Sequence, residues 1–133
     1  MSSDEAQVLA ANDAFYAAFA ASDVPRMSAL WAQETAVMCI HPGWDVLVGR
    51  GDVLDSWRGI FGGGGPPIVA SRARALIAGE VALVTCLEGA PDEPPSLIAT
   101  NTFVREQGQW KMIHHHAGPV ARMRELPPLS TAN

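Results

Sequence analysis

The stretch that decides the fold is TNTFVREQGQWKMIHHHA, residues 100–117. Apolar and polar side chains alternate before and after the pair Gln107-Gly108. Two alternating runs separated by a short turn that contains glycine are typical of a β-hairpin. We therefore predict one strand over residues 97–105 and a second over residues 110–117.

One face of this hairpin has the composition of a pocket wall. With a two-residue turn, Asn101 faces His114 across the two strands, and side chains alternate along each strand. His115 then belongs to the opposite face. An apolar surface with a few polar groups is typical of a small-molecule site. The residues predicted to share the pocket face are Asn101, Phe103, Arg105, Trp110, Met112, His114 and His116.

The rest of the chain predicts helices first and strands afterwards. Helices are expected over residues 2–21, from about Asp23 with Pro25 in the first turn, and over residues 53–61 with Asp52 as cap, because apolar residues there recur at spacings of three and four. The remaining strands are expected at residues 36–40, 46–48, 68–75 and 81–89. This order indicates an α+β fold in a single domain, residues 1–121, followed by a mobile tail, residues 122–133.

Composition excludes several classes of partner. The 133 residues carry a net charge of −5, which argues against a nucleic-acid interface. No apolar run approaches the ~20 residues that span a bilayer, so no membrane association is expected. The acidic start of the chain lacks the pattern of a signal peptide, and Cys39 and Cys86 are expected to be free, buried thiols. A cytoplasmic protein is the expectation.

Three parts of the chain together have a familiar pattern: Phe15–Asp23 with Met27–Trp31, Cys39–Trp44 with Gly49-Arg50 and Val53–Trp57, and Thr100–Arg105 with Trp110–Ala117. They resemble the SnoaL-like branch of the nuclear transport factor 2-like superfamily. The last part includes the pattern Trp-x-x-x-His-x-His in its closing strand. The resemblance implies a cone-shaped α+β fold, with N-terminal helices packed in a strongly curved antiparallel or mixed sheet, and a homodimer formed through the convex face.

The resemblance extends only in part to the ketosteroid isomerases of this superfamily. Their catalytic tyrosine would fall on Phe15, or on Tyr16 with a shift of one residue. Their general-base aspartate would fall near Cys39 to His41, where the chain has no acid. Their second aspartate would fall on Asn101, which can still donate a hydrogen bond. Steroid isomerisation is therefore not expected.

The leading hypothesis is a pocket for a small, mainly apolar carbonyl compound, with cofactor-free isomerase, cyclase or dehydratase chemistry. His41 would be the acid or base, because histidine titrates near neutral pH. Asn101, together with His114 or Tyr16, would polarise the carbonyl group. The alternatives are that His41 only bonds to its loop and that Asn101 is satisfied by its neighbours on the strand.

The expected ligand-binding residues come from four parts of the chain. Trp57 is equally a candidate for the core, and Trp44 follows a Pro-Gly turn at the expected pocket rim. If the pocket is filled by its own side chains, the protein is a non-catalytic binding or oligomerisation module. The residues expected to line the pocket are Phe15, Tyr16, Trp44, Trp57, Phe103, Met112 and His116.

Two further groups of side chains have open interpretations. His41, His114 and His116 can form a three-histidine metal site, but the resemblance favours structural hydrogen bonds, so no metal and no other cofactor is expected. Arg50 either anchors its loop through backbone contacts or attracts an anionic ligand. Arg72 and Arg74 are either a solvated or interfacial pair or an anion site.

Overall fold

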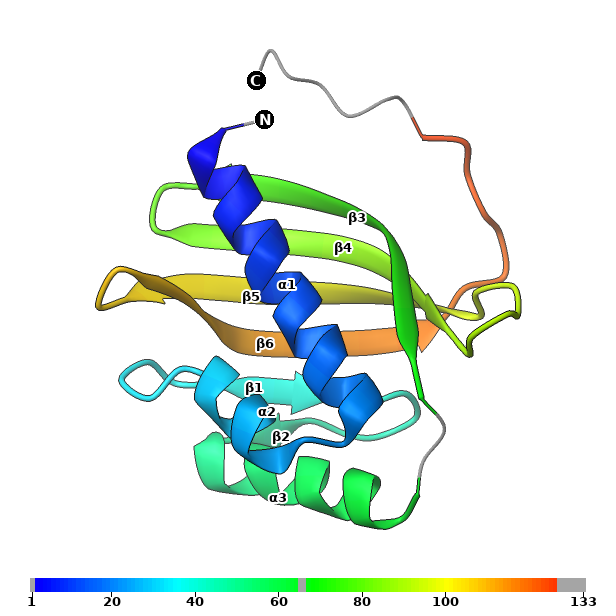
Figure 1. The fold of residues 1–133 in the computed structure, drawn as a ribbon, viewed down its shortest axis with the longest axis horizontal. Helices are drawn as coiled ribbons and strands as arrows, with labels where there is room; N and C mark the ends of the chain where they lie inside the picture. Colours follow the sequence, from blue (N-terminus) through cyan, green and yellow to red (C-terminus); the bar gives the residue numbers. More distant parts are fainter. Residues whose placement is uncertain (1, 65–66, 127–133) are drawn as a thin grey trace.

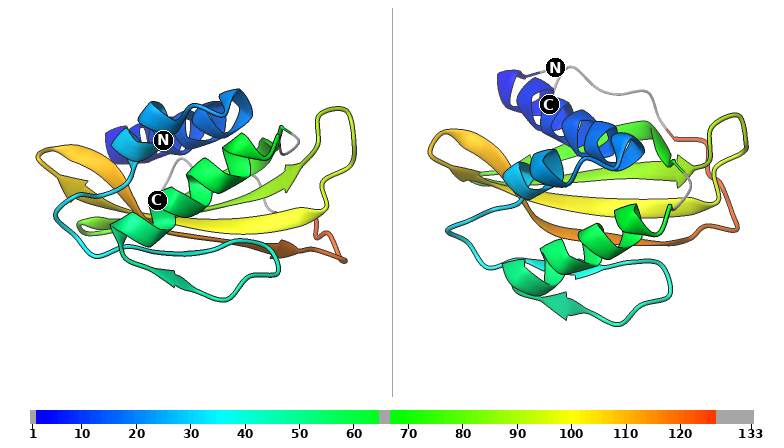
Figure 2. Two further views of the ribbon diagram at one scale, coloured as in Figure 1. Left: turned by 90° about the horizontal axis from the view of Figure 1, so that it is seen from below. Right: turned by 60° about the horizontal axis from the view of Figure 1, so that its bottom comes forward.

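The helices of the protein cover one face of a single sheet. The computed structural model describes residues 2–64 and 67–126. Helices α1 (Ser3–Ala21), α2 (Val24–Leu30) and α3 (Arg50–Gly62) lie on the same side of the sheet, with α1 crossing its face (Figures 1 and 2). The strands are β1 (Met38–Ile40), β2 (Leu47–Val48), β3 (Val69–Ala78), β4 (Val81–Gly89), β5 (Leu97–Glu106) and β6 (Gln109–Pro119).

The sheet has six strands in the order β2-β1-β6-β5-β4-β3. Strand β1 runs parallel to β6, and the other neighbouring pairs are antiparallel, so the sheet is mixed. The predicted α+β fold with helices packed against a mixed sheet is therefore confirmed.

The helix ends follow from local sequence. The Ser2 hydroxyl accepts a hydrogen bond from the backbone of Glu5, and the Asp23 carboxylate accepts one from the backbone of Arg26, as expected of N-caps. The third helix begins earlier than predicted. Gly49, with a φ of 95°, precedes the first helical residue, and Asp52 lies in the first turn. The prediction that Asp52 caps this helix is wrong, because the positive φ of Gly49 turns the chain into the helix three residues sooner.

The predicted hairpin turn is confirmed, but the predicted register is not. Gln107 and Gly108 both have positive φ values, as a two-residue hairpin turn requires. Further along, Thr102 pairs with His114 and Phe103 pairs with Met112, so Ile113 is an extra residue in β6. A bulge of this kind reverses the alternation of all side chains beyond it.

The reversal corrects one prediction about the site. Asn101 pairs with His115, and not with His114. His115 is 1% exposed and faces the helices, whereas His116 is exposed on the outer face of the sheet. The prediction that His114 and His116 share the inner face with Asn101 is wrong, because it assumed an unbroken two-residue period.

The core lies between the helices and the inner face of the sheet. Its largest members are aromatic or sulfur-containing side chains that are almost completely buried. Phe15 of α1 meets Trp57 of α3 edge to face, with their ring centroids 5.5 Å apart. The largest buried apolar side chains are Trp31, Trp57, Phe15, Phe103, Met27 and Met112.

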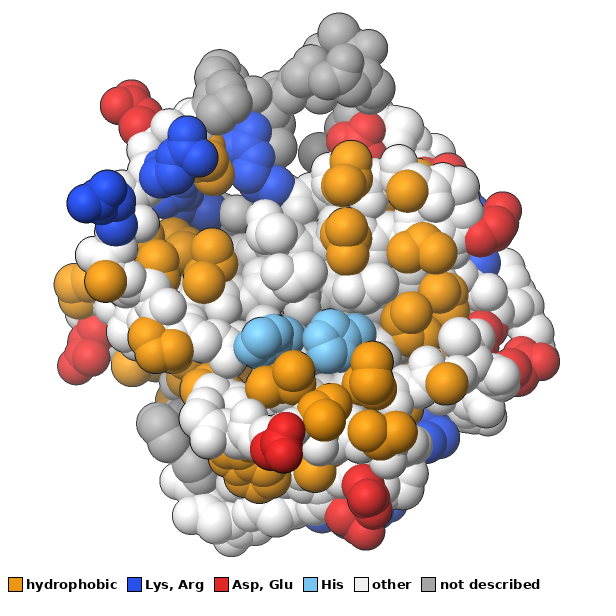
Figure 3. Space-filling view, turned by 180° about the vertical axis from the view of Figure 1, so that it is seen from behind, with side chains coloured by type: hydrophobic (Ala, Val, Ile, Leu, Met, Phe, Trp, Pro, Cys, Tyr) orange, Lys and Arg blue, Asp and Glu red, His pale blue; other side chains and the backbone are white. Residues whose placement is uncertain are grey.

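The outer face of the sheet exposes many apolar side chains, among which histidines are also visible (Figure 3). Val48 is 62% exposed and Leu76 is 60% exposed. Within the described ranges, no helix has the length and apolar character needed to cross a bilayer. The exposed apolar residues of the strands are Met38, Val48, Val69, Leu76, Val81 and Ile98.

The segment after β6 has neither helix nor strand as far as residue 126. Its start is fixed where the backbone N–H of Val120 donates to the carbonyl of Ser96. Farther along, the Arg72 guanidinium donates to the carbonyl of Arg124 at 2.8 Å. The mobility predicted for residues 122–133 stays a prediction, and residues 127–133 lie outside the described part of the chain.

Candidate active site

A cavity of about 250 Å³ opens at the end of the sheet where α1, α3 and the start of β5 meet. Its walls are mainly apolar, and three titratable side chains reach it: His41, Glu88 and His115. This combination of an apolar wall and a few polar groups is typical of a small-molecule pocket. The lining residues are Phe19, His41, Pro42, Trp44, Ile60, Ile68, Glu88, Leu97 and His115.

The carboxyl group of Glu88 is the most unusual group in this cavity, because it is 2% exposed. The Tyr16 hydroxyl donates a hydrogen bond to its Oε2 at 2.5 Å. The Cys86 thiol in turn donates to the Tyr16 oxygen at 3.2 Å. Burial raises the pKa of Glu88 above its ordinary value, and the hydrogen bond from Tyr16 partly opposes this shift.

Asn101 organises the side chains beside Glu88. Its amide nitrogen donates to Asn12 Oδ1 at 2.8 Å and to the Tyr16 oxygen at 3.1 Å. Its amide oxygen lies 2.6 Å from Nδ1 of His115. Because this oxygen can only accept, Nδ1 of His115 carries the proton. The unprotonated Nε2 of His115 then lies 4.0 Å from Oε2 of Glu88.

Both histidines of the cavity are neutral near pH 7. Burial lowers the pKa of His115 to about 3, with smaller contributions from nearby histidines. Burial also lowers the pKa of His41 to about 4. The expectation that His41 titrates near neutrality is therefore wrong, because its ring is 4% exposed and desolvation disfavours the charged form.

His41 is held from α3 rather than by its own loop. The Ser56 hydroxyl donates to the carbonyl of Val53 at 2.6 Å, so its oxygen is free to accept. Nε2 of His41 lies 2.8 Å from this oxygen and therefore carries the ring proton. The neighbouring Trp44 ring meets His41 edge to face at 4.9 Å and is 49% exposed, which agrees with its predicted position at the rim.

The structure brings together some of the predicted site residues. Tyr16 and Asn101 belong to the network beside Glu88, and His41 and Trp44 line the cavity. His114 and His116 lie on the other side of the sheet, where Nδ1 of His114 donates to the carbonyl of Met38 at 3.0 Å. The three-histidine metal site is therefore not formed. Packed in the core, outside the cavity wall, are Phe15, Trp57, Phe103 and Met112.

Two residues of the site were missed by the sequence reasoning: Glu88 and His115. Glu88 could have been found from the sequence, because it is the one charged residue within the predicted strand at residues 81–89. Alternation along that strand places it on the same face as Val84 and Cys86, which are buried. His115 could not have been found in this way, because three histidines in a row hide the bulge at Ile113.

Comparisons with known proteins agree with this fold. The family model described as "SnoaL-like domain" matches residues 8–122. A crystal structure from Streptomyces avermitilis, "putative dehydratase from the NTF2-like family", is 37% identical, with a TM-score of 0.75; the match covers 90% of this chain and 97% of that one. A second, from Thiobacillus denitrificans, is 35% identical, with a TM-score of 0.74 and 85% and 94% covered; its name is "putative calcium/calmodulin-dependent protein kinase type II association domain".

A curated relative lies in a larger protein. The F-box protein SKIP8 of Arabidopsis thaliana is 26% identical over 111 residues, which are 83% of this chain and 48% of that protein. The chain thus spans about half the length of this relative. The family model covers most of the chain, and the two bacterial structures share its fold. The chain therefore belongs to the SnoaL-like domain family, within the nuclear transport factor 2-like superfamily.

Proposed function

We propose that the cavity binds a small, mainly apolar carbonyl compound and transfers a proton on it without a cofactor, with Glu88 as the acid/base group. The observation that carries this proposal is the buried carboxyl of Glu88 in an apolar cavity, with its pKa raised. A raised pKa makes a carboxylate a stronger base at neutral pH. The acid that is missing near residues 39–41 is thus supplied from β4.

The chemistry follows from the groups around Glu88. An oxygen of the carboxylate takes a proton from the carbon next to the carbonyl, and the electrons of the broken C–H bond move into an enolate. If the enolate is conjugated with a C=C bond, Glu88 returns the proton to the far carbon, which is isomerisation. If the β-carbon carries a hydroxyl, Glu88 gives the proton to that hydroxyl, which leaves as water and completes a dehydration. Asn101 is a positioning residue, since it orients Tyr16 and His115.

The similar structures support two classes of function. The Streptomyces protein, named as a putative dehydratase, favours an elimination reaction. The Thiobacillus protein, named as a putative association domain, favours a non-catalytic module. The packing of Phe15, Trp57 and Phe103 in the core also supports this alternative, since these side chains occupy space that a larger ligand would need. We favour the first because an association module has no need of a buried carboxyl.

The proposal is tested with an apolar carbon acid that needs only a base. We expect the protein to cleave 5-nitrobenzisoxazole, with release of the coloured phenolate followed by absorbance. Glu88→Gln should lower kcat/KM at least about tenfold, since a positioned general base typically contributes more than this. Glu80→Gln is the matched control, because the Glu80 side chain is 81% exposed. Equal rates for the wild type and Glu88→Gln would reject Glu88 as the base.

The pH dependence separates loss of the base from loss of the fold. The rate should rise with pH through the raised pKa of Glu88. Because the folded state holds this proton more tightly than the unfolded state, the wild type loses stability as pH rises from 4.5 through the raised value. Glu88→Gln stays neutral, so its advantage in thermal unfolding should grow over the same range. If Glu88→Gln is less stable than the wild type at pH 8, the buried Glu88 carboxylate does not destabilise the fold and this prediction is wrong.

We further propose that a second copy of the chain covers the part of the apolar outer face around Leu76, forming a homodimer. The side chain of Leu76 is 60% exposed there. Leu76→Glu should convert a dimer into a monomer, measured by light scattering after gel filtration, because a buried unpaired charge is costly. Gln7→Glu on exposed α1 is the control. A wild type that is already monomeric at high concentration would refute the dimer.

A further inference from the structure

Four of the nine basic residues of this acidic chain gather at one place. Arg72, Arg74, Arg122 and Arg124 line a groove between β3, β4 and the segment after β6. Basic side chains cluster at one edge of the outer face of the molecule (Figure 3). Such a concentration on a chain of net charge −5 creates a local positive field that attracts anions.

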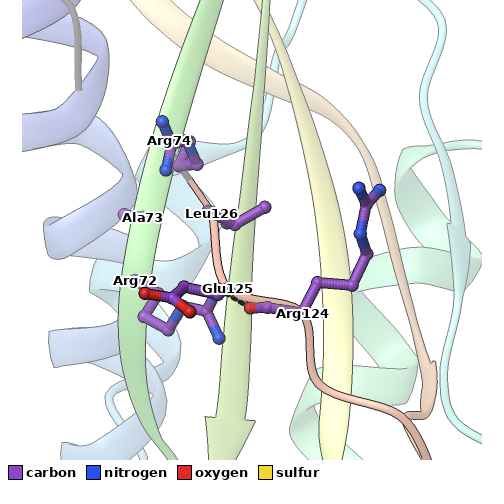
Figure 4. A pocket seen from close by; sticks show the side chains of 6 residues that line it. All are labelled: Arg72, Ala73, Arg74, Arg124, Glu125 and Leu126. Atoms are coloured by element: carbon purple, nitrogen blue, oxygen red, sulfur yellow. Dashed lines mark hydrogen bonds between the residues drawn. The ribbon is translucent and has the colours of Figure 1, made fainter. Parts of the chain in front are cut away.

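The backbone of β3 is distorted where it carries two of these arginines, Arg72 and Arg74. The register of β3 against β4 shifts between Ser71 and Arg74, and Arg72 has a φ of 55°. Left-handed backbone is costly for a residue with a side chain, and bulges commonly redirect side chains next to binding sites. Here the redirected Arg72 donates to the carbonyl of Arg124 and holds the outer segment against the strand (Figure 4).

The groove has two connected parts with different character. The first has a volume of about 410 Å³ and is lined by Arg72, Arg74 and Arg124, together with Ala73, Glu125 and Leu126 (Figure 4). Glu125 is the one acidic residue that lines either part among the described residues. The second part has a volume of about 150 Å³ and shares Arg72, Arg124 and Leu126 with the first. Its other lining residues are Thr85, Cys86, Leu87, Ile98, Val120, Arg122 and Met123.

We infer that this groove binds an amphipathic anion, with a carboxylate or phosphate head on the arginines and a short apolar chain in the second part. Arginine is suited to such heads because its planar fork donates two parallel hydrogen bonds to one anionic group. Leu87, Ile98 and Met123 provide apolar surface for the chain. A free inorganic anion would leave this apolar part unused.

The groove is separate from the cavity that contains Glu88. Consecutive residues of β4 point to opposite faces of the sheet. Glu88 lines the inner cavity, whereas Thr85 and Leu87 line the groove. Cys86 lies on the same face as Glu88 and also borders the groove, but it does not line the cavity. The two sites therefore share strands β4 and β5 but no lining residue, and their ligands can be tested independently.

Isothermal titration calorimetry with four probes tests the inference. Octanoate and octyl phosphate have both an anionic head and an apolar chain, inorganic phosphate has only the head, and octanol has only the chain. Both amphiphiles should bind at least about tenfold more tightly than phosphate or octanol, because each single-character probe loses one set of contacts. Their affinity should fall as salt is added. Whichever of octanoate and octyl phosphate binds more tightly identifies the head group that the arginines prefer.

Variants locate the site. Arg122→Gln with Arg124→Gln should weaken both amphiphiles at least about tenfold, since charge-assisted hydrogen bonds are lost. These residues lie in a segment without helix or strand, so their replacement leaves the sheet intact. Met123→Ser should weaken the amphiphiles but not phosphate. Arg58→Gln, on the exposed face of α3, is the matched control and should change nothing.

Several results would overturn the inference. Octanol binding as tightly as octanoate would mean an apolar cavity only, and phosphate binding as tightly would mean a simple anion site. Loss of octanoate binding in Glu88→Gln, but not in Arg122→Gln with Arg124→Gln, would place the amphiphile in the inner cavity. Failure of all four probes to bind at millimolar concentration would also refute it.

Discussion

Replacing Arg50 with methionine should lower the free energy of unfolding by about 3 kcal/mol, since several charge-assisted hydrogen bonds are lost at once. The Arg50 guanidinium donates to the carbonyls of Trp31 and Ala32 at 2.8 and 3.1 Å. It also donates to the carbonyl and hydroxyl of Ser28 at 2.8 and 3.1 Å. These acceptors lie at the end of α2, so Arg50 joins this helix end to the start of α3. Denaturation by urea measures the loss.

Two matched variants make this prediction specific. Arg50→Lys keeps the charge but not the planar fork, and should retain only part of the stability. Arg58→Met, which removes an exposed pair with Asp55, should cost less than about 0.5 kcal/mol. If Arg50→Met and Arg58→Met unfold at the same urea concentration, the anchoring role is refuted. The same result would revive the alternative that Arg50 serves an anionic ligand.

The sequence predicted those features that depend on neighbouring residues. The turn at Gln107-Gly108 is an example, because the glycine readily adopts the positive φ that the turn requires. The caps at Ser2 and Asp23 are others, since a short polar side chain satisfies backbone N–H groups two or three residues ahead. The loop-anchoring role of Arg50 was one of two open interpretations, and its position between two glycines could not decide between them.

The arrangement of the site was not predictable in the same way. One extra residue, Ile113, turns His115 inward and His114 and His116 outward. Nothing in three identical residues indicates which of them is buried. The bulge becomes visible only when Asn101 is paired across the sheet, so the error arose from assuming a regular register.

The missing base is a second case of long-range placement. The acid was sought near residues 39–41, where the related isomerases have theirs. In this chain the carboxyl comes from Glu88 on β4, which the sheet separates from β1 by β6 and β5. Glu88 and His41, the residue directly after β1, line the same cavity because α1 and α3 close over the inner face. Such proximity depends on topology, which local patterns do not contain.

The second large effect is expected for Asn101→Leu, which should destabilise the protein by about 3–4 kcal/mol. Asn101 is 0% exposed and hydrogen-bonds to Asn12, Tyr16 and His115. Leucine has a similar size but would leave the Asn12 oxygen and the Nδ1 proton of His115 buried without partners. Buried groups that lose their partner cost about 1–3 kcal/mol each. Thermal and urea unfolding measure this loss, with Thr102→Val on the same strand as the control.

The pH dependence of the cleavage rate shows whether Asn101 also positions the base, because a purely structural role would leave that dependence unchanged. The amide of Asn101 donates to the oxygen of Tyr16, which makes the Tyr16 hydroxyl a stronger donor to Glu88. Without Asn101 this donor weakens, the carboxylate is less stabilised, and the pKa of Glu88 rises further. Cleavage of 5-nitrobenzisoxazole by Asn101→Leu should therefore reach its half-maximal rate at a higher pH than in the wild type. An unchanged midpoint would mean that Asn101 supports the fold without tuning the base, because loss of packing alone leaves the hydrogen bond from Tyr16 to Glu88 in place.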